Sequence, residues 1–211
     1  AKSEKGVAFL FMHTSKCKKC RRLGMSVCGK AKCALKARPY PPGMHGKAFR
    51  RGGSEFGQQL AEKQKVKAMY GVRERQFRRY FDVASKSRAM TATALARALE
   101  TRLDNVVYRL GFASSRNQAR QMAGHGHFTV NGRRVDVPSY AVKKGDEIAL
   151  RDGSAGKKLF QDVRISIKKH EPPQWLELDK ENLKAKVKQM PSEGELELPF
   201  RMQLVTELYS R

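Results

Sequence analysis

The sequence predicts an α+β fold: a helical N-terminal domain with a metal-binding basic arm, and an inserted module of two helices and a short antiparallel sheet. Helical periodicity begins after residue 54, and short β-branched runs flank an Asn-Gly pair near residue 131. All four cysteines precede both patterns. We therefore expect a basic arm with a four-cysteine knuckle over 1–50, a helical domain over 51–91 and 175–211, and the inserted module over 92–174.

The charge balance indicates a polyanionic partner. The chain has 211 residues, with 44 Lys and Arg against 20 Asp and Glu, for a net charge of +24. Such a chain repels itself unless it binds a polyanion, and nucleic acid is the leading candidate. Residues 1–90 carry +18 of this charge and residues 151–211 only +2. We expect the first half of the chain to make most of the contacts.

The apolar pattern predicts no association with membranes. No stretch approaches the roughly 18 apolar residues that a membrane span needs. The run "VAFLFM" at residues 7–12 is shorter than the apolar core of a signal peptide. We therefore expect a cytoplasmic protein, whose reducing surroundings disfavour disulfides.

The cysteines follow the spacing C-x2-C-x7-C-x4-C through Cys17, Cys20, Cys28 and Cys33. Two closely spaced thiol pairs are typical of a tetrahedral Zn²⁺ site, and the surrounding Lys and Arg side chains favour the thiolate form. A 4Fe-4S cluster uses the same ligands, and four unliganded thiols are the remaining alternative. Because few large apolar residues surround the cysteines, metal binding would supply the folding energy of this knuckle.

A proline-rich strap, "RPYPPGMHG" at residues 38–46, follows the knuckle. Its three prolines and two glycines exclude a helix and favour an extended or turning segment. Such a strap can lie along phosphates with Tyr40 and His45 free to stack or to donate hydrogen bonds. A plain linker is the alternative.

Three helices are predicted next, over residues 54–69, 73–85 and 92–100. Ser54 is the expected cap of the first. The second has apolar residues at helical spacing on one face and arginines on the other, a stripe that either is solvated or binds phosphates. Its apolar face is formed by Phe77, Tyr80, Phe81 and Ala84.

The module begins with "RLDNVVYRLGF", where Leu103, Val106, Val107 and Leu110 share one helical face and Gly111 ends the helix. In the following "SSRNQARQMAGHGH", Ser115 and Gln118 form a capping box. The backbone donors of this helix start, beside Arg116 and Arg120, are a predicted anion site.

The sheet is predicted from "FTVNGRRVDV", in which Asn131-Gly132 favours a type I′ turn that displays Arg133 and Arg134. The stretch "VKKGDEIAL" supplies a further strand. We expect these two arginines to converge with the two on the preceding helix into one cluster. His125 and His127 precede the hairpin, and a turn that contacts RNA or merely ends the helix is favoured over a metal site. The C-terminal apolar residues Trp175, Leu204, Val205, Leu208 and Tyr209 are expected to pack on the N-terminal helices.

These patterns together resemble one family, the bacterial type of small-subunit ribosomal protein four. The similar stretches are "RPYPPGMHG", "EKQKVKAMYGVRERQFRRYF", "LETRLDNVVYRLGFASSRNQARQMAGHGHFTVNGRRVDVPSY" and "QLVTELYSR". They cover roughly residues 38–140 and the C-terminus. The cysteine segment resembles the four-cysteine, metal-binding subgroup of that family.

The resemblance implies a ribosome-bound structural protein, not an enzyme. It implies early binding to small-subunit rRNA at a helix junction of the 5′ domain, neighbours in small-subunit proteins three and five, and a place near the channel where mRNA enters, with a role in translational accuracy. An RNA-modifying enzyme that borrows the module is one alternative, although too few residues follow the module for a catalytic domain. A zinc-dependent DNA-binding regulator is another.

The patterns and the resemblance together give one set of expected RNA-binding residues. Its members are Arg21, Arg22, Arg38, Tyr40, His45, Lys63, Lys67, Arg73, Arg75, Arg78, Arg79, Arg102, Arg109, Ser115, Arg116, Gln118, Arg120, His125, His127, Asn131, Arg133 and Arg134.

Overall fold

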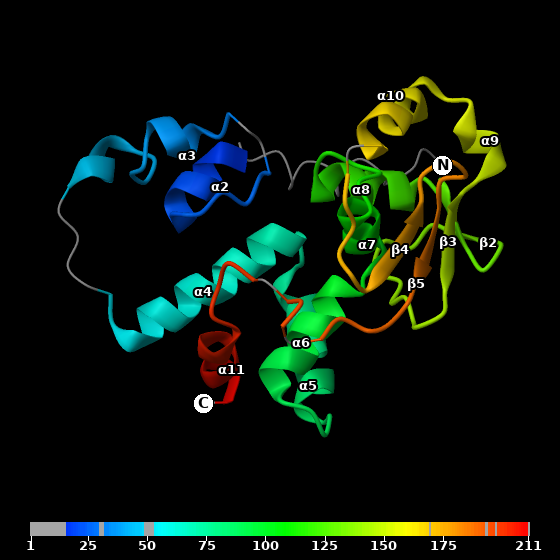
Figure 1. The fold of residues 1–211 in the computed structure, drawn as a ribbon. Helices are drawn as coiled ribbons and strands as arrows, with labels where there is room; N and C mark the ends of the chain where they lie inside the picture. The colour runs from blue at the N-terminus through cyan, green and yellow to red at the C-terminus, as the bar shows by residue number, and fades with distance from the viewer. Residues whose placement is uncertain are drawn as a thin grey trace, which may run out of the picture.

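The structure, a computed structural model, describes residues 16–29, 32–48, 53–168, 170–192, 194–196 and 198–210. The apolar run at residues 7–12 lies outside these ranges. Among the helices in the described ranges, none combines the length and the apolar character that crossing a bilayer requires. The architecture is mixed helical and antiparallel β, which confirms the predicted fold class (Figure 1).

Four helices form the first hydrophobic core, and they come from both ends of the chain: α11 lies beside α4 and α6 (Figure 1). Ser54 caps α4 as predicted, because its Oγ accepts a hydrogen bond from the Gly57 amide at 3.2 Å. Gly71 ends the same helix at φ 63°, a conformation that favours glycine. The four helices are α4 (Glu55–Tyr70), α5 (Glu74–Ser85), α6 (Thr91–Glu100) and α11 (Met202–Ser210).

The second core lies between helices and a five-stranded antiparallel sheet of order β2-β1-β3-β5-β4. The predicted hairpin is confirmed, with Asn131 and Gly132 at φ 51° and 77°, as a type I′ turn requires. The elements are α7 (Leu103–Arg109), α8 (Arg116–Gly124), β1 (Phe128–Val130), β2 (Arg133–Val135), β3 (Glu147–Leu150), α9 (Asp152–Ala155), α10 (Lys158–Ile167), β4 (Leu176–Asp179) and β5 (Lys184–Val187).

Two of the expected domain boundaries are wrong. Strand β5 pairs with β3 and with β4, so residues 175–187 extend the module instead of joining the helical domain. Trp175, 2% exposed, is buried in the module core and not against the N-terminal helices. Conversely, α6 belongs to the helical core, because Leu95 and Leu99 are buried there. Tyr209 does pack as expected, stacking on Phe81 at 4.9 Å.

The arm contains short elements: α2 (Lys16–Leu23), α3 (Ala34–Ala37) and a 3-10 turn, η1 (Met44–Lys47). The last one corrects the expectation that the strap contains no helix at all. The turn forms because Gly43, at φ 109°, reverses the chain directly after the two prolines. Gly46 is then buried, and a Cβ at this position would meet the carbonyl oxygen of Pro41 at 2.1 Å. The strap is therefore folded tightly on itself.

Candidate metal centre and nucleic-acid surface

Three short elements bring the four cysteines together. Cys17 and Cys20 lie one turn apart on α2, Cys28 follows in the next loop, and Cys33 precedes α3. The Sγ atoms of Cys17, Cys28 and Cys33 all lie within 4.8 Å of one another. Cys20 is buried in the same cluster as Cys28 and Cys33, and no disulfide joins any of the four. The predicted thiol cluster is therefore present.

Backbone amides are aimed at the sulfur atoms. Burial raises the pKa of Cys20 to about 12, although the amides of Val27 and Cys28 donate to its sulfur and favour the thiolate. The Leu35 amide donates to the sulfur of Cys33 and lowers its pKa to about 7. Amide donors that stabilise sulfur charge in a buried thiol cluster suit a bound cation. The donor set fits a structural metal site, and it fits Zn²⁺ and a 4Fe-4S cluster equally.

Arg21 fastens the strap to the knuckle. Its Nε and Nη2 donate to the carbonyl oxygens of Tyr40 and Pro41, at 2.9 and 3.1 Å. Its guanidinium also lies 4.8 Å from the centre of the Tyr40 ring, where a cation is attracted to the ring face. Two expected RNA-binding side chains thus contact each other. By contrast, Arg22, Arg38 and His45 are exposed.

On the helical domain, the lysines and the arginines have different environments. Lys63 and Lys67 are both paired with Glu74, at 3.1 and 2.5 Å. The arginines of α5 and its N-cap have no such partners among the described residues, and all are exposed. These are Arg73, Arg75, Arg78 and Arg79.

Arg102 and Arg109, two of the expected RNA-binding residues, both pair with carboxylates inside the protein. Arg102 is 1% exposed and forms two hydrogen bonds with Asp104, at 3.0 and 2.6 Å. Arg109 forms two with Glu100, at 3.0 and 2.9 Å. The buried Arg102 therefore offers no exposed donor surface for a phosphate without breaking its pair, whereas the Arg109 side chain is 29% exposed.

The arginines of α8 also turn inward. Arg116 donates to Asn105 at 2.8 Å and lies 4.5 Å from the ring centre of Tyr108. Arg120 lies 3.5 Å from a carboxylate oxygen of Asp104. Ser115 caps the helix as predicted, by accepting from the Gln118 amide at 3.3 Å. The expected four-arginine cluster is thus divided: Arg116 and Arg120 are partly exposed and contact side chains of the module, and the other two lie on the hairpin.

The hairpin is the exposed basic feature of the module. Arg133 and Arg134 are exposed, and Arg134 passes so close to Gly126 that a Cβ there would meet its Nε at 2.3 Å. The Asn131 side chain holds the turn, donating to Asp146 at 2.8 Å. This geometry presents the two arginines from a fixed turn.

The two histidines beside the hairpin have different environments. His127 is buried, 2.9 Å from the Ser154 hydroxyl, whereas His125 is exposed. Burial and the neighbouring cations lower the pKa of His127. Its position in the core corrects the expectation that it contacts RNA.

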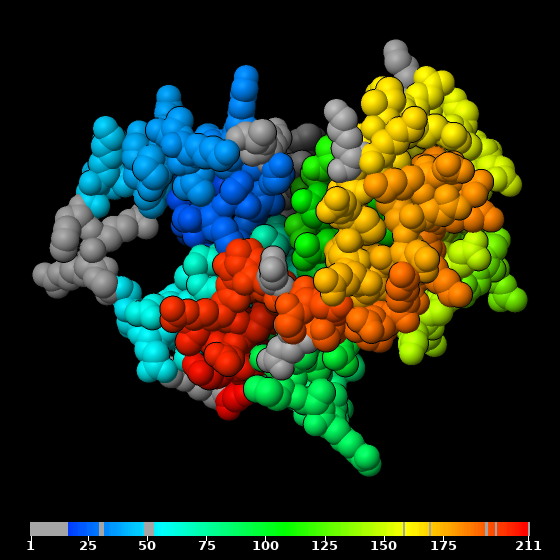
Figure 2. All heavy atoms as spheres, in the orientation of Figure 1, coloured from blue at the N-terminus to red at the C-terminus, as the bar shows by residue number. Residues whose placement is uncertain are grey.

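The exposed members of the predicted set form what we call the basic surface. It spans the arm, α5 with its N-cap, and the hairpin, which project from different parts of the molecule in Figure 2. Its members are Arg22, Arg38, His45, Arg73, Arg75, Arg78, Arg79, His125, Asn131, Arg133 and Arg134.

Sequence reasoning missed the polar network that joins the two cores. Tyr70 and Asn105 donate to the Glu100 carboxylate at 2.5 and 2.8 Å, alongside Arg109. Arg116 lies over the Tyr70 ring at 5.3 Å. The detectable signal was an acidic residue at a position where the periodicity of α6 predicts burial.

Known proteins show clear similarity to this chain. The model of the ribosomal protein S4/S9 N-terminal domain matches residues 12–100, and that of the S4 domain matches residues 101–148. The small ribosomal subunit protein uS4 of Caldicellulosiruptor bescii is 50% identical over 201 residues, covering 92% of this chain and 96% of that protein. The protein of the same name from Thermus thermophilus is 48% identical with the same coverage. The boundary at residue 100 coincides with the junction of α6 and α7.

Proposed function

The chain belongs to the ribosomal protein S4 family, whose members are structural, non-enzymatic proteins of the small ribosomal subunit that bind rRNA. On this premise, we propose that it binds and organises a helix junction in the 5′ domain of that rRNA during assembly. The observation that carries the proposal is the division of its basic surface between the helical core and the module. Arginines project from α5 on the helical core and from the hairpin on the module. Two separate basic patches can contact two RNA helices at the same time.

The salt dependence of RNA binding tests whether the N-terminal charge and the hairpin have different roles in it. Residues 1–90 carry +18, and each neutralised phosphate adds roughly 0.7–0.9 to the slope of log affinity against log salt. Removing residues 1–50 should therefore flatten the slope markedly. The hairpin should instead select RNA shape, because its two arginines are fixed by the turn.

The matched variants are R133Q/R134Q and K143Q/K144Q, which each remove two exposed charges from the module. Both should flatten the salt slope equally. Only R133Q/R134Q should reduce the preference for a folded 5′-domain fragment over a scrambled RNA. Equal preference in the two variants would refute the role of the hairpin, and equal affinity of the wild type for folded RNA and duplex DNA would refute RNA recognition.

We further propose neighbours in small-subunit proteins three and five, a position near the channel where mRNA enters, a contribution to translational accuracy and a cytoplasmic location with the ribosome. The family relation supports these roles. Crosslinking within reconstituted subunits identifies the neighbours, and misreading of a near-cognate codon by subunits with and without the chain measures accuracy. Crosslinks to neither protein, or unchanged misreading, would remove the respective role.

We propose that the four cysteines hold one Zn²⁺, with a 4Fe-4S cluster as the alternative. The ion would serve folding, because the arm has an apolar cluster formed mainly of the cysteines themselves. Elemental analysis of freshly purified protein should find one zinc per chain. Iron with visible absorption would identify the cluster instead, and neither metal would refute the site.

A further inference from the structure

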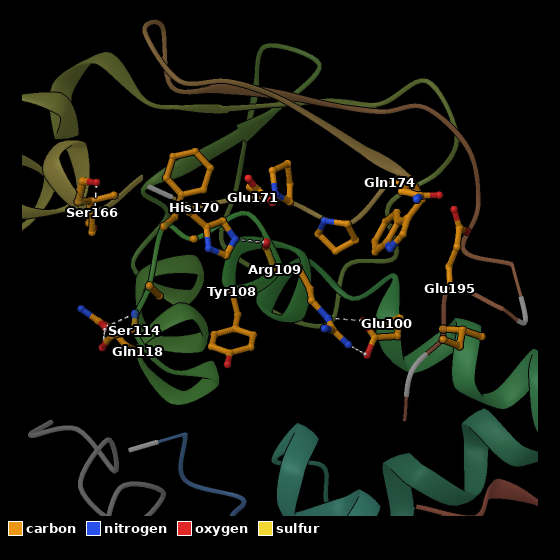
Figure 3. Close-up of a pocket in the computed structure, with 18 of the residues that line it drawn as sticks. Glu100, Tyr108, Arg109, Ser114, Gln118, Ser166, His170, Glu171, Gln174 and Glu195 are labelled. Atoms are coloured by element: carbon orange, nitrogen blue, oxygen red, sulfur yellow. Dashed lines mark hydrogen bonds and ion pairs between the residues drawn. The ribbon is translucent and has the colours of Figure 1, made fainter. Parts of the chain in front are cut away.

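A groove of about 1020 Å³ opens on the module (Figure 3). Its walls are the end of α7, the start of α8, one face of α10 and the segments 170–175 and 194–196. Buried Phe112 and Trp175 lie beneath it, and Pro172 and Pro173 form part of the wall. The groove therefore combines an apolar base with an open, polar rim.

Helix α10 turns one particular face to the groove. Leu159, Asp162, Val163 and Ser166 line it, at the i, i+3, i+4 and i+7 spacing of a single helical stripe. The basic side chains Arg164 and Lys168, at the end of this helix, are absent from the lining. Among its described side chains, the helix thus presents a carboxylate and no cation to this space.

The cationic groups that line the groove in the described ranges are already bound. Arg109 is paired with Glu100, and His170 donates from Nε2 to the Arg109 carbonyl oxygen at 2.7 Å (Figure 3). Asp162 and Glu171 are exposed, and neither has an ion-pair partner among the described residues. Among the described side chains that line the groove, the charges without an ion-pair partner are therefore negative.

A third carboxylate stands at the opposite wall. Glu195 accepts hydrogen bonds from the Ser192 amide and hydroxyl, at 2.8 and 2.9 Å, which hold its pKa below the usual range. Half of the chain's acidic residues lie after residue 150. Since the Debye length at physiological salt is about 8 Å, a ligand in the groove senses the carboxylates that line it more than charges beyond that range.

We propose that this groove binds an extended, lysine- and arginine-rich segment of another protein. Its basic side chains pair with Asp162, Glu171 and Glu195, and its aliphatic stems cover the proline and aromatic base. RNA is the less suitable occupant, because its phosphates would face unpaired carboxylates. The RNA contacts proposed above on α5 and on the hairpin do not line the groove.

The test uses a labelled peptide of alternating Lys and Ser, with a Glu-Ser peptide as the negative probe, and the full-length chain. The variant D162N/E171Q should bind the Lys-Ser peptide about tenfold more weakly, since it loses two rim ion pairs. The control E181Q/D82N makes the same change of net charge at exposed carboxylates outside the groove. It should bind like the wild type.

Two results would overturn the proposal. One is equal peptide affinity in D162N/E171Q and the control, which would assign any binding to net charge alone. The second uses the variant D162K/E171K with E181K/D82K as its matched control. If the proposal is right, D162K/E171K loses peptide binding, and its affinity for the 5′-domain RNA fragment is no higher than that of the control. A selective gain in RNA affinity would assign the groove to RNA. Binding of the 5′-domain RNA fragment to the wild-type protein, measured separately, tests the proposed function.

Discussion

Glu100 and Arg109 form a doubly hydrogen-bonded ion pair, at 3.0 and 2.9 Å, across the junction between the two hydrophobic cores. Glu100 is the last residue of α6 in the helical core, and Arg109 is the last of α7 in the module. The side chains are 2% and 29% exposed. Tyr70 and Asn105 donate to the same carboxylate. Because four donors converge on one buried anion, the angle between the two bodies is tightly specified.

The substitution E100Q should destabilise the protein by about 3 kcal/mol, because it leaves a largely buried guanidinium without its charge partner. Burial raises the pKa of Glu100, but hydrogen bonds and charge from Arg109 outweigh it and lower that pKa overall, so the native carboxylate is ionised at neutral pH. Urea unfolding measures the loss. The control E147Q breaks an exposed pair with Lys184, 53% and 57% exposed, and should cost less than about 0.5 kcal/mol. Equal losses of unfolding free energy in E100Q and E147Q would contradict a stabilising role for the buried ion pair.

Acid should weaken the attachment of α11 through Glu74. Burial raises the pKa of Glu74, yet hydrogen bonds from Lys67, Tyr209 and Lys63 bring it down from 4.5 to about 2. A carboxyl whose folded pKa is depressed contributes stability above its unfolded pKa, and loses that contribution as pH falls through the folded value. Wild type should therefore be more stable than E74Q above pH 4.5. This difference should shrink as the pH falls towards 2.

The pH dependence of the free energy of unfolding of both proteins checks this expectation, with hydrogen exchange of the α11 amides as a local readout. The control is E55Q, which changes an acid at the start of α4 away from the contact between Glu74 and Tyr209. Its stability relative to wild type should not follow the same course with pH. A stability difference between wild type and E74Q that stays constant from about pH 6 to about pH 2 would contradict the depressed pKa.

The sequence correctly predicted the structural features that depend only on residues close to one another in the chain. The Ser54 cap, the Asn131-Gly132 turn and the Ser115 cap are all present, since each depends on neighbours within a few residues. Helix α10 and strands β4 and β5 were missed. Strand β5 alternates buried Ala185 and Val187 with exposed lysines. So short a pattern does not predict a strand by itself, and the strand forms because it pairs with β3.

For the site residues too, the sequence predicted what depends on local spacing and not what depends on tertiary contacts. Sequence predicts which residues are cationic, but it does not show which cations face a carboxylate. Arg102 meets Asp104 only two positions away, whereas Arg109 meets Glu100 through the packing of α6 on α7. The second relation depends on tertiary structure, as does the stacking of Arg116 on Tyr108. The cysteines were predictable because their spacing alone limits their geometry.

The strap should be sensitive to a single methyl group. In G46A the new Cβ meets the Pro41 carbonyl oxygen, which is backbone and cannot rotate away. We expect the turn η1 to open and the Arg21 contacts to Tyr40 and Pro41 to break, with little change in global stability. Limited proteolysis at residues 38–48 should become at least several-fold faster. In the control G53A the added Cβ has no atom within 4 Å, so cleavage should stay at the wild-type rate; a resistant G46A would show that the strap tolerates the methyl.

Metal removal should loosen the arm and leave the helical core folded. The arm's own apolar cluster consists of Cys20, Cys28 and Cys33 with few additions, whereas α4, α5 and α6 pack around Phe77, Leu95 and other large side chains. A chelator should therefore increase amide hydrogen exchange in α2 and α3 by orders of magnitude, while exchange in α4 and α6 stays slow.

The variant C20S should reproduce the effect of the chelator without any reagent, because it removes one of the four proposed sulfur ligands. The matched variant S26A loses a weak 3.9 Å contact to the Cys28 sulfur but no cysteine, so it should keep the metal and its slow exchange. The same measurement also reports on the module, since Gly29 of the knuckle lies near the Tyr108 hydroxyl and the Ser114 carbonyl oxygen. Exchange at the start of α8 should rise modestly in C20S, because that contact is lost. If chelator and C20S leave α2 and α3 as protected as in wild type, the thiol cluster is held by packing alone and the metal assignment fails.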